Sequence, residues 1–169
     1  MATDTLINTP NRLASGAGLA DVWWKTGRCT VKTSASETAG GFSQVEILDP
    51  RGTAPPMHIH HNDDEAFYVL EGELTLLADG ARIDAGPGDY VFVPRGTSHA
   101  YLVRSEWARV LVTFSPAGFE DVFVRAGVEV TGAEPPADAV LPSPEEFVRL
   151  LAPYGCEITG PPPTLDDLV

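Results

Sequence analysis

All four histidines of this chain fall in two short stretches, at His58, His60, His61 and His99. On extended backbone, successive side chains point to opposite faces, so His58 and His60 share one face and His61 takes the other. Glu65 follows after a short polar turn, and we expect it to join the face of His58 and His60. The spacing therefore predicts β-strands whose common face gathers imidazole and carboxylate groups.

A strand in the second stretch could bring His99 alongside the first. Three imidazoles and one carboxylate, from His58, His60, His99 and Glu65, would then surround a divalent ion and leave coordination positions open. The alternative is a group of histidines on a half-buried strand edge beside an ordinary acidic loop. We favour the metal site because the ligand set is complete and its members have the required parity.

Turn residues bracket both stretches. Gly52 and Gly72 flank the first, and Gly88 and Gly96 flank the second. Glycine reaches positive φ without steric cost, as sharp turns in a small barrel require, and Pro94 fits the end of a strand but not its middle. The chain has 16 glycines and 15 prolines among its 169 residues. Their combined share is well above the usual one of about 12%. This composition favours many short strands joined by tight turns.

Strand-like patterns recur at close, regular spacing, which is typical of an antiparallel sandwich or barrel. Residues 1–20 show no period and predict an N-terminal arm, residues 21–115 a barrel core, and residues 116–169 a C-terminal helical extension that packs on the barrel. The expected strands are 22–25, 29–34, 42–48, 57–60, 65–70, 73–77, 81–84, 90–93, 98–103 and 108–114.

Two short helices are expected in the C-terminal extension. The first opens at Ser115-Pro116, with proline at the first helical position, and stops at Gly127. In the second, Ser143 is the N-cap and Glu146, three residues on, completes a capping box. Apolar residues recur at helical spacing in both segments.

The whole pattern, G-x5-H-x-H-x4-E-x6-G followed by G-x5-P-x-G-x2-H, resembles the two motifs of the cupin superfamily. The resemblance implies an all-β fold, the cupin double-stranded β-helix or jelly-roll barrel, with one or two short C-terminal helices. The second cupin motif usually has asparagine four residues after its histidine, where this chain has Val103. This departure changes the polarity of the pocket rather than the ligand set.

A closer resemblance covers the segment from about Gly40 to Phe123. It is similar to single-domain bacterial cupins of the quercetin 2,3-dioxygenase-like group, on residues 55–61, 64–73 and 94–100. In that group, three histidines and a glutamate hold nickel, manganese, cobalt, iron or copper. The glutamate is thought to deprotonate the flavonol hydroxyl before oxygen cleaves the ring and carbon monoxide leaves.

Transferred to this chain, the resemblance implies His58, His60, Glu65 and His99 as metal ligands and Glu65 as the catalytic residue. The expected cofactor is one divalent transition metal ion, whether nickel, manganese, iron, cobalt, copper or zinc, because imidazole–carboxylate sets accept several first-row ions. Glu65 would serve either as a permanent ligand or as a general base that takes the proton of the substrate.

Parity extends the prediction to a substrate pocket. Phe67, Val69, Tyr101 and Val103 share faces with the candidate ligands of their own strands, and we predict that they bind substrate. Such a pocket suits a flat or apolar organic molecule that carries one or two coordinating oxygens. The alternative is that these side chains simply fill a small barrel.

Three functions fit these residues. The first is a metal-dependent dioxygenase of a phenolic or enolic small molecule, with flavonol ring cleavage as the best example, for which molecular oxygen is the second substrate. The second is a metal-assisted cyclase or isomerase of a polyketide-like or sugar substrate. The third is a barrel that binds a small molecule without turnover.

Charge narrows the range of partners. The formal net charge is −13, which argues against nucleic acid and anionic membrane surfaces, because a phosphate-binding face needs clustered lysine and arginine. No helix-turn-helix segment or basic, apolar leader is recognisable, and the apolar runs are strand-sized, so we expect a cytoplasmic protein without a membrane span.

Two further expectations concern cysteines and assembly. Cys29 and Cys156 match no metal-binding spacing and are expected to be free thiols. A homodimer that pairs through sheet edges is expected, and Trp23 and Trp24 mark either that contact or an intramolecular one.

Overall fold

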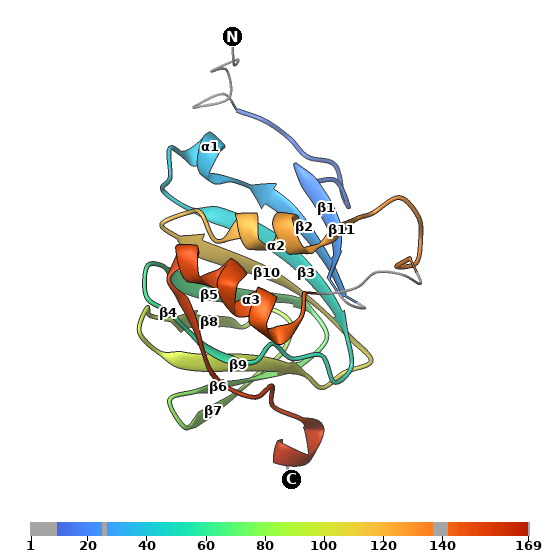
Figure 1. Cartoon of the computed structure of the whole chain (residues 1–169). Coiled ribbons are helices and arrows are strands. Elements are labelled where there is room, and N and C mark those ends of the chain that lie inside the picture. The colour runs from blue at the N-terminus through green and yellow to red at the C-terminus, as the bar shows by residue number, and fades with distance from the viewer. Residues whose placement is uncertain (1–9, 25–26, 137–141, 169) are drawn as a thin grey trace.

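Two antiparallel sheets face each other and enclose the core (Figure 1). The computed structural model describes residues 10–24, 27–136 and 142–168. The strands are β1 (Ala20–Trp24), β2 (Gly27–Thr33), β3 (Ser43–Pro50), β4 (Met57–His60), β5 (Asp64–Glu71), β6 (Leu74–Ala78), β7 (Ala81–Ala85), β8 (Tyr90–Val93), β9 (Ser98–Val103), β10 (Trp107–Ser115), β11 (Val128–Glu129) and β12 (Cys156–Gly160).

The strand order defines a jelly-roll barrel. The larger sheet runs β11-β1-β2-β3-β10-β5-β8 and the smaller one β12-β4-β9-β6-β7. Consecutive strands along the chain often lie in different sheets, so the candidate ligands on β4 and β5 approach each other across the barrel. The predicted all-β class is confirmed, and each of the ten expected strands is present. The helical elements are α1 (Ala35–Thr38), α2 (Glu120–Ala126), α3 (Pro144–Leu151), and the 3-10 turns η1 (Ala152–Tyr154) and η2 (Leu165–Leu168).

The predicted start of the first C-terminal helix is wrong. The helix α2 begins at Glu120, four residues after Pro116. Gly118 has a φ of 135°, which no helix accommodates. The Glu120 carboxylate also accepts a hydrogen bond from the Gly118 amide over 2.6 Å, which holds this loop ahead of the helix. The predicted stop is confirmed, because Gly127 is the C-cap.

The second C-terminal helix follows its sequence signals. Ser143 is the N-cap of α3, and its side chain accepts a hydrogen bond from the Glu146 amide while Glu146 bonds back to the Ser143 amide. Both halves of the predicted capping box are therefore present. In Figure 1, α3 lies beside α2 across the front of the barrel.

The packing of α3 leads to a stability prediction. Leu151 is 2% exposed, whereas Val148, on the same helix, is 51% exposed. We expect Leu151→Ala to lower the free energy of unfolding by about 2–5 kcal/mol, because it leaves a cavity in the core. Val148→Ala, the matched control, should change it by no more than about 0.5 kcal/mol. Urea denaturation of both variants measures this, and equal effects would contradict the buried placement of Leu151.

Trp24 makes intramolecular contacts, and its neighbour Trp23 is buried. Trp23 is 9% exposed. The ring centroid of Trp24 lies 5.3 Å from that of Phe123 on α2 and 5.8 Å from that of Phe147 on α3. Of the two alternatives left open by the sequence, Trp24 therefore takes the intramolecular one, in which it anchors the C-terminal helices to β1.

The C-terminal extension also supplies a strand that the sequence analysis missed. Strand β12 pairs with β4, with Cys156 opposite His60 and Ile158 opposite His58. The end of the chain thus supports the strand that carries two candidate ligands. The alternating residues of this segment were the available signal, but its short length and flanking prolines obscured it.

Several local expectations are met. Gly52, Gly72, Gly88 and Gly96 all have positive φ. At Gly72 a Cβ atom would lie 2.1 Å from the Trp107 carbonyl oxygen, so the turn also needs glycine for space. Both cysteines are free and buried. No helix in the described part of the chain has the length and apolar character that crossing a bilayer requires.

Candidate metal centre

The structure brings four sequence-predicted residues together inside the barrel. Antiparallel pairing of β4 with β9 sets His58 directly opposite His99, and His60 follows two residues along β4. Glu65 enters from β5, in the other sheet. One ligand atom from each of the four lies within 4.8 Å of the others, which is a distance that a single ion can span.

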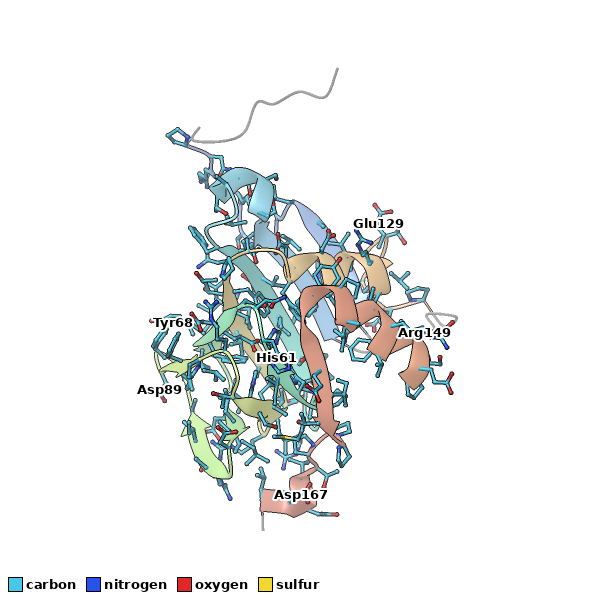
Figure 2. The ribbon with its side chains drawn as sticks, turned by 60° about the vertical axis from the view of Figure 1, so that its left-hand side comes forward. His61, Tyr68, Asp89, Glu129, Arg149 and Asp167 are labelled. Carbon is cyan, nitrogen blue, oxygen red and sulfur yellow. The ribbon has the colours of Figure 1, made fainter. Side chains whose placement is uncertain are left out.

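His61 takes the opposite face, as its parity predicts. Its side chain is 50% exposed, and its Nε2 atom lies 2.9 Å from Oε2 of Glu157 on β12. Figure 2 shows His61 beside this C-terminal strand. Because it faces away from the other three imidazoles, His61 is a natural control for them.

Hydrogen bonds orient two of the imidazoles. Nδ1 of His58 lies 2.7 Å from the Pro56 carbonyl oxygen, and Nδ1 of His99 lies 3.0 Å from that of Thr97. A carbonyl oxygen only accepts, so each Nδ1 carries the proton and donates. Nε2 of His58 then keeps its lone pair, which is the arrangement that metal-binding histidines commonly show. Nε2 of His99 faces Oε2 of Glu65 and donates its proton to it, so His99 would have to release that proton to bind an ion.

The third imidazole and the carboxylate complete the donor set. Nε2 of His60 lies 3.4 Å from Oε2 of Glu65, and Nε2 of His99 lies 2.7 Å from the same oxygen. Neither ring nitrogen of His60 makes a hydrogen bond with the described residues. A buried imidazole normally has partners, so these two nitrogens without hydrogen bonds fit a residue that serves as a metal ligand. Three nitrogen donors and one oxygen donor fit a divalent transition metal.

Charge states follow from the same contacts. Burial, and next the neighbouring His99, lower the pKa of His58 to about 4. Burial would raise the pKa of Glu65, but the hydrogen bond from His99 and the nearby imidazoles outweigh burial and hold this pKa below its ordinary value. At neutral pH the centre therefore has a neutral imidazole at His58 and an ionised carboxylate at Glu65.

Asp63 is a site residue that the sequence analysis missed. It is 4% exposed, and its Oδ2 atom lies 2.9 Å from Nδ1 of His60, although the contact does not meet hydrogen-bond geometry. Metal-binding histidines commonly donate their second ring N–H to a carboxylate, and Asp63 places a carboxylate within that distance of His60. Its position within a polar turn gave no sign that it would turn inward.

We expect Asp63→Asn to weaken metal binding about 10- to 100-fold, as changes around metal-ligating histidines commonly do. Asparagine keeps the size of the side chain but removes the negative charge that favours a well-oriented His60. Competition with a chelator of known affinity measures the change. Asp89→Asn, in the turn before β8, should leave the affinity unaltered, and an equal loss in both variants would contradict this role.

Arg95 ties together the loops around the centre. Its guanidinium donates to both carboxylate oxygens of Asp64, over 3.0 and 2.9 Å, and to the Asn62 carbonyl oxygen over 3.0 Å. Hydrogen bonds from Arg95 lower the pKa of Asp64 to about 2. These hydrogen bonds hold the loops that follow β4 and β8 together, at the end of the barrel nearest the candidate metal centre.

Aromatic side chains cover this end. The ring centroid of Phe119 lies 4.3 Å from that of His60, in an edge-to-face arrangement, and the centroid of Phe114 lies 5.8 Å from it. Cys156 is also close, because it pairs with His60 across β12 and β4. Burial, and then Glu65 and Asp63, raise the pKa of its thiol to about 12. The centre is therefore enclosed by apolar groups, which strengthens electrostatic interactions inside it.

Of the predicted pocket residues, three line a small internal cavity. Phe67 and Val103 are each 1% exposed, Val69 is fully buried, and the Tyr101 hydroxyl donates to Asp49 over 2.7 Å. The cavity has a volume of about 10 Å³ and is lined by Ile47, Asp49, Phe67, Tyr101, Val103, Ala108, Val110 and Val112. Val69 lies outside this lining, and Asp49 is a polar member that the sequence analysis did not single out.

Comparison with known families agrees with the geometry. The family described as "Cupin domain" matches residues 44–114, which contain all four candidate ligands. The barrel is a cupin domain. A solved cupin structure from Shewanella frigidimarina, described as RmlC-like, superposes with a TM-score of 0.57 at 20% identity, covering 69% of this chain and 99% of that one.

Two curated relatives of this cupin are named quercetin 2,3-dioxygenase. The protein from Bacillus subtilis is 31% identical over 121 residues, which is 72% of this chain and 35% of the relative. The one from Aspergillus japonicus is 31% identical over 88 residues, which is 49% of this chain and 25% of the relative. This cupin is thus quercetinase-like, but it spans about a third or less of the length of these two relatives.

Proposed function

We propose that this cupin is a metal-dependent dioxygenase of a phenolic or enolic small molecule, with flavonol-like ring cleavage as its closest example. The convergence of His58, His60, His99 and Glu65 within 4.8 Å carries this proposal. The two curated relatives named quercetin 2,3-dioxygenase support it. One divalent transition metal ion would be held by these four residues.

The bound ion and the residues of the chain would contribute different parts of the reaction. A bound divalent ion acts as a Lewis acid that lowers the pKa of a coordinated hydroxyl. Glu65, which the neighbouring imidazoles keep ionised, accepts the hydroxyl proton on its carboxylate. The apolar cover formed by Phe114 and Phe119 excludes water from the deprotonated substrate. Both atoms of O2 then enter the ring-opened ester while one ring carbon leaves as carbon monoxide.

Oxygen uptake decides between this proposal and its alternatives. Adding the flavonol quercetin to metal-loaded protein should consume oxygen and release carbon monoxide in equal amounts. Turnover of a polyketide-like or sugar substrate under strict anaerobiosis, without oxygen uptake on flavonols, would instead favour a cyclase or isomerase. Ligand binding that survives removal of the metal by a chelator, with no turnover, would favour a binding barrel.

We also propose that two copies associate through the outer face of β5 and β8. Tyr68, Tyr90 and Phe92 are 44%, 64% and 54% exposed there, and Figure 2 shows Tyr68 on the outside of the barrel. β8 ends its sheet and carries no charge within its four residues, so a second copy of this acidic chain meets no like charge along the strand. Natural edge strands usually carry protecting charges.

Light scattering tests this association. The wild-type protein should show twice the chain mass of 18.0 kDa, and Phe92→Lys should show the mass of one chain, because a charge on the edge opposes pairing. A monomeric wild type, or a variant that stays dimeric, would contradict this surface.

A further inference from the structure

Three of the four candidate ligands have almost no contact with solvent. His60, Glu65 and His99 are 2%, 6% and 1% exposed. The cavity deeper in the barrel, beside Phe67, has a volume of about 10 Å³, which admits about one water molecule. An organic substrate therefore reaches these ligands only after part of the surrounding wall has moved.

The walls of the centre differ in how firmly they are held. β4, which carries His60, pairs with β12 and β9, and β5, which carries Glu65, pairs with β10 and β8. Moving one of these strands would break a ladder of backbone hydrogen bonds. The cover at the end of the barrel lies outside these ladders, because Phe119 falls between the last residue of β10, Ser115, and the first residue of α2, Glu120.

Phe119 is the side chain that closes this end. Its ring centroid lies 4.3 Å from that of His60, 5.0 Å from that of Phe114 and 6.3 Å from that of Tyr154. The residue before it, Gly118, has a φ of 135°, and a Cβ atom built there would have no neighbour within 4 Å. Its torsion angles can therefore change without a collision. Residues 116–119, which we call the gate loop, thus carry a bulky ring directly after a residue with a freely turning backbone.

The helix that follows the gate loop is anchored in the core. Val122 and Phe123 are 1% and 9% exposed, and the ring of Phe123 packs on that of Trp24 with their centroids 5.3 Å apart. Moving α2 would return both apolar side chains to water, which is unfavourable. We therefore expect any opening to be confined to the gate loop.

A buried carboxylate fastens the gate loop. Glu120 is 6% exposed. Its Oε1 atom accepts a hydrogen bond from the amide of Ala35 over 2.7 Å, and its Oε2 atom accepts one from the amide of Gly118 over 2.6 Å. Burying a carboxylate is unfavourable without such partners, whereas water satisfies it fully. The carboxylate is bonded when the loop is closed and hydrated when it is open, which keeps the free-energy difference between the two positions small.

We infer that the gate loop opens and closes the metal centre, with Phe119 as the residue that blocks the entrance and Glu120 as the residue that holds the loop shut. Phe119 is then a specificity-determining residue, because it slows ligands that carry an aromatic ring more than ligands of a few atoms. Use of the gate by a substrate rests on the proposed function, whereas the opening itself depends only on these contacts. Loops that close over active sites move in microseconds to milliseconds.

Cobalt-loaded, full-length protein tests the gate by ligand binding instead of turnover. Azide has three atoms and 4-phenylimidazole carries an aromatic ring, and each changes the visible spectrum of cobalt when it binds, which stopped-flow absorbance follows. In wild type, the rate for 4-phenylimidazole should level off at high concentration, because opening of the gate loop precedes binding. The rate for azide should rise in proportion to its concentration.

Two substitutions act on the gate loop. In Phe119→Ala, the rate for 4-phenylimidazole should lose its plateau and rise at least about tenfold, because three ring contacts no longer hold the loop. Glu120→Gln exchanges one accepting oxygen for an amide group that cannot accept from a backbone N–H. Its plateau should rise about tenfold or more, as the loss of a hydrogen bond to a charged group implies. The rate for azide should stay close to that of wild type in both variants.

Matched controls separate the gate from general loosening of the C-terminal helices. The carboxylate of Asp121, the next residue on α2, bonds with residues outside the gate loop, and Phe147 on α3 packs against β1. Asp121→Asn and Phe147→Ala should therefore keep the wild-type plateau. Thermal unfolding and cobalt content establish that each variant is folded and loaded. If Phe119→Ala does not fold, the plateau in Glu120→Gln decides.

A second measurement needs no metal. In the metal-free protein, diethyl pyrocarbonate acylates the histidines that it reaches, and mass spectrometry compares His60 with His61, which is half exposed and serves as the internal reference. Acylation of His60 relative to His61 should increase about tenfold or more in Glu120→Gln, for the same loss of a hydrogen bond. Phe119→Ala should increase it in the same direction.

The outcomes distinguish the gate from the proposed function. A wild-type rate for 4-phenylimidazole without a plateau, or a plateau and an acylation ratio that neither variant changes, would overturn the gate. Failure of 4-phenylimidazole to bind Phe119→Ala when azide binds would also overturn it. A protein that retains no cobalt removes the proposed metal centre, and the acylation ratio then decides the gate. Gated binding of 4-phenylimidazole without oxygen uptake on flavonols leaves the gate and removes the dioxygenase.

Discussion

Replacing His60 by alanine is expected to strip the protein of its metal. The side chain is 2% exposed, and its two ring nitrogens make no hydrogen bonds with the described residues. Alanine therefore removes a nitrogen donor that no other group replaces. Changes outside the ligand set already cost about 10- to 100-fold in affinity, and losing a ligand should cost about a hundredfold or more. Elemental analysis of the purified variant measures the loss, which we also expect for His58→Ala and His99→Ala.

His61→Ala is the matched control for this series. It removes an imidazole from the adjacent position, but one that is half exposed and bonded to Glu157. Metal content should therefore stay at the wild-type level. Full metal occupancy in all three of the other histidine variants would contradict the proposed metal centre. An equal loss of metal in His61→Ala would show that the effect of the other substitutions is indirect.

Replacing Glu65 should damage turnover more than metal loading. Three imidazoles remain in Glu65→Ala and Glu65→Gln, so much of the metal should be retained. The proton acceptor is lost, and general-base catalysis is commonly worth about 100- to 10,000-fold. Oxygen uptake at matched metal content measures the change in turnover number, and substrate affinity measured in parallel shows whether binding is altered.

The control for Glu65 lies at the other end of the same strand. Glu71 is exposed and paired with Arg109, so Glu71→Gln removes a carboxylate from β5 without touching the centre. Its turnover should match wild type. If Glu65→Gln loses its metal as completely as His60→Ala, then Glu65 is an essential ligand rather than the proton acceptor of an intact centre.

Local rules explain how much of the strand pattern could be predicted. Alternation of side chains depends only on extended backbone, so the opposite orientations of His60 and His61 followed from their positions. The capping box at Ser143 is equally local. The first C-terminal helix shows the limit of such rules, because Pro116 fits a helix start but the conformation of Gly118 and the carboxylate of Glu120 postpone the helix to residue 120.

Local rules could not predict the contacts between segments that are distant in the chain. Asp63 turns inward because His60 and the loops held by Arg95 surround it, and nothing in its neighbours along the chain indicates burial. The pairing of Cys156 with His60 joins residues almost a hundred positions apart. Such contacts depend on how the two sheets and the C-terminal segment close on one another.

The sequence by itself determined which residues can act as donors and which of them share a face, because these depend on side-chain chemistry and on the two-residue repeat of a strand. Only the tertiary structure decided that β4, β9 and β5 bring those donors within reach of one ion, that Phe119 covers them, and that Asp49 meets Tyr101 in the interior. The physical reason is that sheet closure sets distances between residues remote in the chain, and no local preference contains those distances.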